Sequence, residues 1–115
     1  MKLLFLYHPV ENIKESTAFY RDALGFKEAW REGDHTVTFQ LPDSDVRLMI
    51  EDEENDLLPG GVFLVDNVDD FYNRNIDNLD FIKSPVDIPP GRYAIYKDIS
   101  GNPIRILDFT NEEKI

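Results

Sequence analysis

The sequence predicts an α+β fold built from two similar βαβββ modules within one chain of 115 residues. Two asparagines, Asn12 and Asn67, each stand directly before a short amphipathic stretch, where a helix needs a side-chain cap. Each stretch follows one apolar segment and precedes further segments with strand-like alternation or β-rich composition. The same order of elements therefore occurs twice, with a repeat of roughly fifty residues.

The first module is expected to begin with a strand over 2–7, followed by a helix that Asn12 caps. Glu15, three residues after the cap, completes a capping-box-like pair, and Gly25 stands where a helix end needs a left-handed residue. One helical face should carry Ile13, Thr17, Tyr20 and Leu24. Three further strands are expected over 26–31, 36–41 and 46–51.

The second module follows an acidic segment, which we interpret as a solvated connector. Asn67 caps its helix over 68–75, and Asp70 takes the place that Glu15 has in the first module. Strands are expected over 61–65, 81–83, 93–98 and 104–109, with a stiff proline loop over 85–91. The predicted division of this single structural domain is 1–52, connector 53–60, second module 61–110 and tail 111–115.

Composition excludes several functional classes. Apolar residues make up 42% and charged residues 30%, as in globular proteins, and no apolar run is long enough to span a membrane. The absence of cysteine excludes disulfides, thiolate metal sites and thiol catalysis. The first residues do not resemble a signal peptide, so a cytoplasmic location is expected. A net charge of -11 argues against nucleic acid as a partner; it is compatible with a cationic ligand, although maintaining solubility is the simpler explanation.

Two stretches carry a resemblance to a known family. The first is the opening of the first helix, Asn12-Ile13, with Phe19-Tyr20 and Leu24-Gly25-Phe26 behind it. The second is the closing segment 96–108, where a turn with Gly101-Asn102 precedes an alternating apolar strand. Together they resemble the vicinal oxygen chelate superfamily, which contains glyoxalases, extradiol dioxygenases and bleomycin- and fosfomycin-resistance proteins. The resemblance covers nearly the whole chain, and it is specific for the fold more than for an activity.

This resemblance implies a curved mixed-sheet cup, the glyoxalase/bleomycin-resistance-like fold. In that family each module curls into a half-barrel, the helix covers the convex side, the concave side holds the metal or ligand, and two chains often pair. A homodimer is therefore expected. Strand alternation then sends Leu4, Leu6, Leu48 and Ile50 toward the helices. The residues expected to face the cup are Phe5, Tyr7, Met49, Glu51 and Arg105.

Metal-using members of the family have four ligand positions, which the resemblance transfers to Phe5, Gly60, Arg105 and a fourth-strand residue. The last is Glu51, or Met49 if the register lies two residues earlier. A phenyl ring, a hydrogen and a guanidinium do not replace imidazoles and carboxylates, so we expect no metal and no cofactor. His8 and His35 are interpreted as strand-end and surface histidines rather than ligands.

The expected ligand-binding residues form one set: Phe5, Tyr7, Phe39, Met49, Glu51, Tyr93 and Arg105. Aromatic concavities bind flat organic molecules. Ordinary core packing is the alternative for the aromatic residues in strands, including Trp30 and Tyr96, and it is strongest for Phe39. Arg105 has two open interpretations: it binds an anionic ligand group, or it pairs with Glu51.

Three functional hypotheses follow. The first is a metal-independent, dimeric protein that binds and sequesters a small organic molecule. The second is an enzyme, a glyoxalase-like lyase/isomerase or a relative of the dioxygenases, that works with no metal or an atypical one. Glu51 would be its catalytic base and Arg105 would stabilise negative charge. The third is an interaction module whose cup is filled by its own side chains. Neither nucleic acid nor membrane is expected as a partner.

Overall fold

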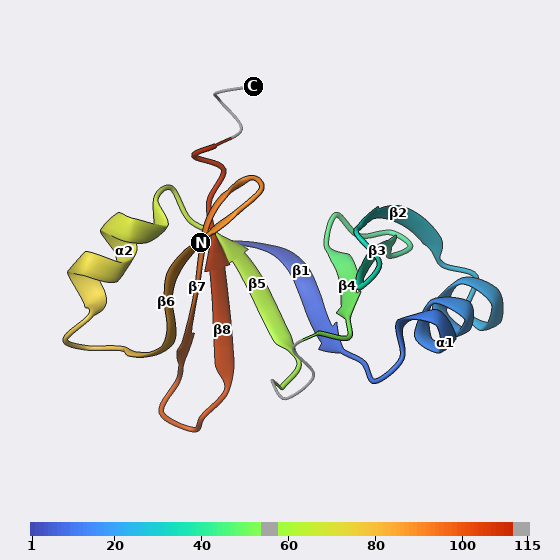
Figure 1. Cartoon of the computed structure of the whole chain (residues 1–115), viewed down its shortest axis with the longest axis horizontal. Coiled ribbons are helices and arrows are strands. Elements are labelled where there is room, and N and C mark those ends of the chain that lie inside the picture. Colours follow the sequence, from blue (N-terminus) through green and yellow to red (C-terminus); the bar gives the residue numbers. More distant parts are fainter. Residues whose placement is uncertain (54–57, 112–115) are drawn as a thin grey trace. The chain divides into compact units, whose positions relative to one another are not determined.

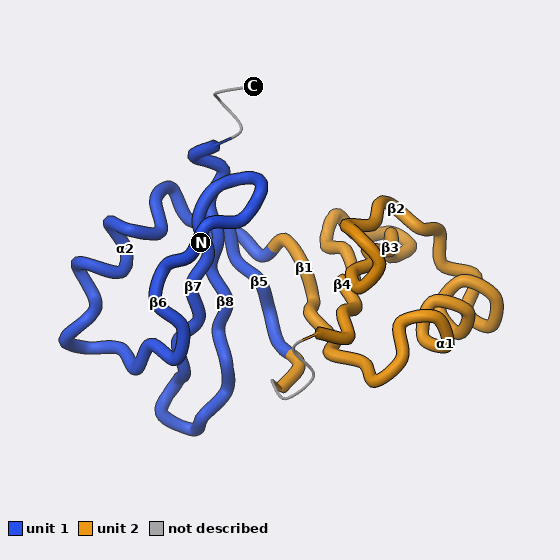
Figure 2. The backbone as a smooth tube through the Cα atoms, in the orientation of Figure 1, with its two compact units in different colours: residues 1–3, 60–115 blue, residues 4–59 orange. Residues whose placement is uncertain are grey.

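The computed structural model describes residues 1–53 and 58–111 and divides the chain into two compact units. Unit 1 contains residues Met1–Leu3 and Gly60–Ile115, and unit 2 contains Leu4–Pro59 (Figure 2). Most of the expected connector and tail, residues 54–57 and 112–115, lies outside the described residues. None of the helices within the described residues is long and apolar enough to cross a membrane.

Unit 2 holds the first βαβββ module (Figure 1). Its strands are ordered β2-β3-β4-β1; β1 and β4 are parallel, and the other neighbours are antiparallel. The elements are β1 (Lys2–Pro9), α1 (Ile13–Ala18), the π-helical segment η1 (Phe19–Ala23), β2 (Lys27–Glu32), β3 (Thr36–Gln40) and β4 (Arg47–Glu51).

Unit 1 holds the second module, with strands ordered β5-β8-β7-β6, of which β5 and β8 are parallel. Its elements are β5 (Gly60–Leu64), α2 (Val68–Asn75), β6 (Asp80–Ile88), β7 (Gly91–Lys97) and β8 (Pro103–Leu107). The predicted α+β architecture of two βαβββ modules is therefore confirmed, with a mixed sheet and an α-helix in each unit (Figure 1).

Both helices begin at the predicted caps. The side-chain oxygen of Asn12 accepts a hydrogen bond from the amide of Glu15 at 3.0 Å, and that of Asn67 accepts one from the amide of Asp70 at 2.9 Å. Each bond satisfies one of the backbone donors that the first helical turn leaves open. Because this signal depends only on neighbouring residues, the sequence was sufficient to predict it.

A carboxylate just beyond the last strand of each module also binds the helix start. Asp52 Oδ2 accepts from the amide of Ile13 at 3.3 Å, and Asp108 Oδ2 accepts from the amide of Val68 at 2.7 Å. Ile13 and Val68 are the first residues of α1 and α2. The two modules thus share a long-range contact as well as an element order, which supports an internal repeat.

Each unit has its own apolar core between helix and sheet. In unit 2, the side chains of Leu48 and Ile50 point toward α1, as predicted, and Leu6 pairs with Leu48 on the same face although it is 38% exposed. The buried residues of the unit 2 core are Ile13, Val37, Phe39, Leu48 and Ile50. Those of the unit 1 core are Val68, Ala94, Tyr96 and Ile106.

The placement of Leu24 on the buried helical face is wrong, because Leu24 is 50% exposed. The chain leaves the α-helix after Ala18 and continues as the π-helical segment, in which the amide of Leu24 bonds to the carbonyl of Phe19. A π-helical turn holds more residues than an α-helical turn, so positions beyond it rotate away from the face that a period of 3.6 predicts. Tyr20 still packs on the core, where its ring lies 5.7 Å from that of Phe39.

The loop predicted over 85–91 is also corrected. β6 continues through Pro85 to Ile88, with irregular pairing to β7 between Phe81 and Lys83 and between Lys83 and Val86. β6 is the last strand in the order of unit 1, so the missing amide of Pro85 need not interrupt a ladder between two strands. Proline is tolerated at such edges and bulges, which the composition of the segment did not reveal.

Candidate functional site

The face of the unit 2 sheet that points away from the α1 core is called here the open face of unit 2. Strand register places residues on it: Tyr7 pairs with Met49 across β1 and β4, Met49 pairs with Thr38, and Thr38 pairs with Trp30. Paired residues share a face, and the face alternates along each strand. Tyr7 and Met49, both predicted to face the cup, therefore lie on the open face.

Phe5 and Trp30 show that this sheet is curved. Phe5 lies on β1 and Trp30 on β2, and these strands are at opposite ends of the four-strand order β2-β3-β4-β1. In a flat sheet, three strand spacings would separate them by about 14 Å. Their ring centroids are nevertheless 6.1 Å apart, in an edge-to-face arrangement at 79°. The open face is therefore concave, and the two rings meet across it.

Glu51 is held in place on this face by Tyr7. The Tyr7 hydroxyl donates a hydrogen bond to Glu51 Oε2 at 2.8 Å. Tyr7 is 2% exposed, whereas Glu51, at the end of β4, is half-buried. A hydroxyl that donates to a carboxylate stabilises its charged form, so Glu51 provides a fixed negative charge beside Tyr7.

Phe39, predicted as a ligand contact, does not lie on the open face. It is 0% exposed and belongs to the core under α1, together with Ile13 and Leu48. It shares that face with Val37, because residues two positions apart on a strand point to the same side of the sheet. Core packing, the alternative reading of Phe39, is the one that its position supports.

The two candidates in the second module lie on the face of the unit 1 sheet that points away from the α2 core, which we call the open face of unit 1. Arg105 pairs with Ile95, and Tyr93 pairs with Leu107, on the face opposite to the α2 core. Arg105 is 0% exposed, and Tyr93 is half-buried with Lys83 Nζ 5.9 Å from its ring centroid.

Tyr96 does not face the ligand side, and core packing, the stated alternative for this residue, is what its position supports. It is 7% exposed, belongs to the α2 core and stacks on Phe71 with ring centroids 5.7 Å apart.

Residues 5–106 match the model of the Glyoxalase/Bleomycin resistance protein/Dioxygenase superfamily. The chain belongs to this superfamily. The predicted vicinal oxygen chelate resemblance and the glyoxalase/bleomycin-resistance-like fold are thereby confirmed.

Solved structures show the same glyoxalase-like fold at low sequence identity. A structure from Legionella pneumophila, named as an NAD-dependent benzaldehyde dehydrogenase, has a TM-score of 0.75 and 18% identity, covering 92% of this chain and 98% of that one. Methylmalonyl-CoA epimerase from Mycobacterium tuberculosis has a TM-score of 0.72 and 15% identity, with coverages of 98% and 91%. A superfamily member from Vibrio splendidus 12B01 has a TM-score of 0.69 and 19% identity, with coverages of 93% and 97%. No curated protein matches the chain.

Backbone hydrogen bonds align the two modules of this glyoxalase-like chain residue by residue. The amide of Val10, before α1, bonds to the carbonyl of Glu51 at 2.8 Å. The amide of Val65, before α2, bonds to the carbonyl of Leu107 at 2.9 Å. Glu51 in the first module therefore corresponds to Leu107 in the second, and the residues two positions earlier, Met49 and Arg105, correspond to each other.

This alignment favours Met49, one of the two alternatives for the fourth-strand metal position. If Arg105 takes the last-strand ligand position, its counterpart is Met49 and not Glu51, so the four positions carry Phe5, Met49, Gly60 and Arg105. A side chain at Gly60 would begin 3.2 Å from Arg105 Nη1, which places the guanidinium beside that position. A phenyl ring, a thioether, a glycine and a cationic guanidinium do not suit a hard divalent ion, which prefers oxygen or nitrogen donors. Among residues 1–53 and 58–111, no three His, Cys, Asp or Glu residues gather as a metal site.

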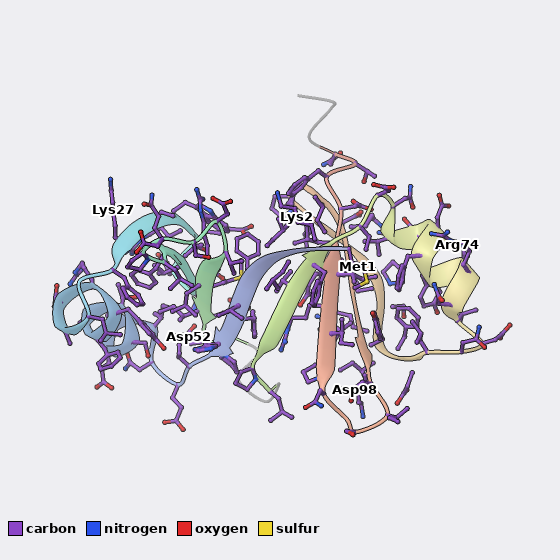
Figure 3. All side chains as sticks on the ribbon, turned by 180° about the vertical axis from the view of Figure 1, so that it is seen from behind. Met1, Lys2, Lys27, Asp52, Arg74 and Asp98 are labelled. Atoms are coloured by element: carbon purple, nitrogen blue, oxygen red, sulfur yellow. The ribbon has the colours of Figure 1, made fainter. Side chains whose placement is uncertain are left out.

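The histidines lie on the helix side and at a turn of unit 2. His8 Nδ1 lies 3.4 Å from the Tyr20 hydroxyl, and His35 Nδ1 lies 2.6 Å from Asp52 Oδ1. The hydrogen bond to Asp52 is the main cause that raises the pKa of His35 above its ordinary value. The side chain of Asp52, labelled in Figure 3, thus contacts both His35 and the amide of Ile13.

Sequence reasoning missed a hollow on this side of unit 2. An open groove of about 800 Å³ lies between the start of α1 and the β2–β3 turn. Its lining has both charge signs: Glu11, Asn12, Ile13, Lys14, Thr17, Arg21, Arg31, Asp34, His35, Val37 and Asp52. Two of its arginines already bind acidic neighbours, Arg21 to Asp22 and Arg31 to Glu28. The groove therefore has no dominant charge to select a ligand.

Proposed function

We propose that this member of the superfamily is a metal-independent protein that binds and sequesters a small, flat organic cation on the open face of unit 2. The observation that carries the proposal is the carboxylate of Glu51, held by Tyr7 at 2.8 Å, on the same concave face as the Phe5–Trp30 ring pair. Flat rings bind between aromatic side chains, and a carboxylate binds an ammonium or amidinium group.

Electrostatics support a cation over an anion at this face. Glu51 is half-buried and its charged form is stabilised by a hydrogen bond from Tyr7. Arg47 lies on the same face, where it pairs with Phe5, and it is about 13 Å along β4 from Glu51, so its charge acts mainly at the other end of the face. The net charge of -11 adds a long-range attraction for cations. Aromatic rings also attract cations through their faces.

Further parts of the proposal concern the second module and the assembly. Tyr93 and Arg105, on the open face of unit 1, are proposed contacts for an anionic group of a ligand, since arginine binds carboxylate or phosphate in a forked geometry. A homodimer is proposed from the family resemblance, and a cytoplasmic location stays a prediction. Light scattering of the purified protein will measure the mass in solution, and a monomer would contradict the dimer.

The second candidate is a glyoxalase-like lyase or isomerase with Glu51 as general base. It is favoured by the same hydrogen bond, because a base must be held at a defined position. The hydrogen bond from Tyr7, however, stabilises the ionised carboxylate and so reduces its drive to accept a proton. Isomerisation of a methylglyoxal hemithioacetal, lost in Glu51→Gln, would favour this enzyme over the binding protein.

Benzamidine, a flat aromatic amidinium, is the probe for the proposed binding function, and calorimetric titration is the assay. We expect benzamidine to bind, and Glu51→Gln to weaken it about tenfold or more, since a charged hydrogen bond is lost. Glu15→Gln, which removes the same charge from an exposed position on α1, on the other side of the sheet, should bind as the unchanged protein does. Neutral benzamide and the non-aromatic cyclohexanecarboxamidine should both bind more weakly. Equal affinity of the Glu51→Gln and unchanged proteins would refute the proposal.

A further inference from the structure

Thr38, on β3 of unit 2, is a buried polar side chain that packing does not explain. It is 0% exposed, and its Oγ1 forms no hydrogen bond with any residue in 1–53 or 58–111. A buried hydroxyl without a partner loses its bonds to water and gains none, which destabilises the fold. Valine has the same shape and lacks this cost, so the hydroxyl calls for a functional reason.

The position of Thr38 connects it with the proposed ligand face. Val37 and Phe39, its neighbours on β3, belong to the core under α1, so Thr38 lies on the opposite, open face. Register pairs it with Trp30 on one side and Met49 on the other. Methionine side chains are flexible, so a movement of Met49 would give a ligand access to the Thr38 hydroxyl.

The spacing between Thr38 and Glu51 sets the size of a ligand that reaches both. Glu51 lies two residues beyond Met49 on β4, or about 6.7 Å along the strand, and Thr38 lies one strand spacing across from Met49. Their α-carbons are therefore about 8 Å apart on the same face. This is the span of one aromatic ring that carries a polar group at each end.

From this juxtaposition we infer that the ligand is a single-ring aromatic cation with a hydroxyl or carbonyl group opposite its cationic end, and that the Thr38 hydroxyl selects that group. The inference rests on the proposed function, because Glu51 holds the cationic end. A buried polar group discriminates strongly, since an analogue without the matching group leaves it unpaired.

Two amidines and two variants test this selection by calorimetric titration. The unchanged protein should bind 4-hydroxybenzamidine about fivefold more tightly than benzamidine, the gain of one ordinary hydrogen bond. Thr38→Val should lose this preference, whereas Thr38→Ser, which keeps the hydroxyl, should retain it. Without ligand, Thr38→Val should unfold at a temperature about 2–5 °C higher, because an unpaired buried hydroxyl has been removed.

The outcomes separate this inference from the function on which it rests. If benzamidine binds through Glu51 but Thr38→Val leaves the preference for the hydroxyl compound unchanged, the selection by Thr38 is refuted while the binding function stands. A lower unfolding temperature for Thr38→Val would also refute the inference, since the hydroxyl would then have a stabilising partner in the folded protein. If neither amidine binds the unchanged protein, both proposals fail together.

Discussion

Replacing Asp108 by asparagine is predicted to destabilise unit 1 severely. Asp108 is 0% exposed, and Val68 N donates to its Oδ2 at 2.7 Å. Its Oδ1 accepts from Arg92 N at 2.8 Å, Thr110 Oγ1 at 2.8 Å and Thr110 N at 3.3 Å. Every one of these partners is a donor, so the amide group of asparagine would face donors with its own N–H atoms.

The size of the effect follows from these bonds. Loss of the negative charge weakens all of them, and at least one backbone amide loses its acceptor in a buried place. Hydrogen bonds to charged groups contribute about 1.5–3 kcal/mol, and a buried unsatisfied group costs about 1–3 kcal/mol. We therefore expect Asp108→Asn to lower the free energy of unfolding by about 3 kcal/mol.

Asp52→Asn is the matched comparison, because Asp52 has the equivalent position in unit 2. Its side chain is 16% exposed and accepts from Ile13 N and His35 Nδ1. Water can replace part of these contacts, so we expect a loss of only about 1 kcal/mol. Urea unfolding followed by far-ultraviolet circular dichroism measures both values. Equal losses in the two variants would refute the reasoning from burial and hydrogen-bond count.

The same carboxylate predicts an acid limit of stability. Burial raises the pKa of Asp108, but the hydrogen bonds from Val68, Thr110 and Arg92 outweigh it and hold this pKa below its ordinary value. A group with a lowered folded pKa contributes stability that is present above the unfolded pKa, near 4, and is lost as pH falls through the folded value. Asp108→Asn should therefore remove part of the loss of stability below about pH 4.

Two further predictions concern unit 2. Phe39→Ala should lower the free energy of unfolding by about 3–5 kcal/mol, because the ring is 0% exposed in the core with Ile13. Calorimetric titration of the still-folded variant at low temperature should show unchanged benzamidine affinity. A loss of affinity without a loss of stability would place Phe39 on the ligand face. The raised pKa of His35, caused chiefly by Asp52, predicts a stability contribution that is complete below about pH 6.5 and is lost as pH rises through the folded value. Urea midpoints from pH 5 to 9 should show this decline, and His35→Gln should abolish it; the same decline in both proteins would contradict the assignment.

The helix starts and strand faces were predictable because they depend on local pattern. Asn12 and Asn67 were identified from sequence alone, and both accept the expected backbone hydrogen bonds. Alternation along β1 and β4 placed Tyr7, Met49 and Glu51 on one face without any knowledge of the sheet. That face was then confirmed by register, while the role of these residues in binding stays a prediction.

The remainder depended on tertiary context. A phenylalanine in a strand is equally compatible with a core and with a ligand cup, and only the packing of α1 over the face of Phe39 distinguishes these two positions. The Tyr7–Glu51 hydrogen bond requires the parallel register of β1 and β4, which no local pattern specifies. Thr38 has only a weak signal in the sequence, a polar residue between Val37 and Phe39 in a strand, which does not show whether its hydroxyl has a partner.

The contact between Phe5 and Trp30 has a practical consequence. Trp30 is the single tryptophan of the chain, and it lies on the concave face where the proposed ligand would rest. Its intrinsic fluorescence therefore reports on that face alone, without any attached label. An aromatic ligand that separates the two rings would change the emission of Trp30 directly. Compounds can therefore be screened by tryptophan fluorescence of the unmodified protein.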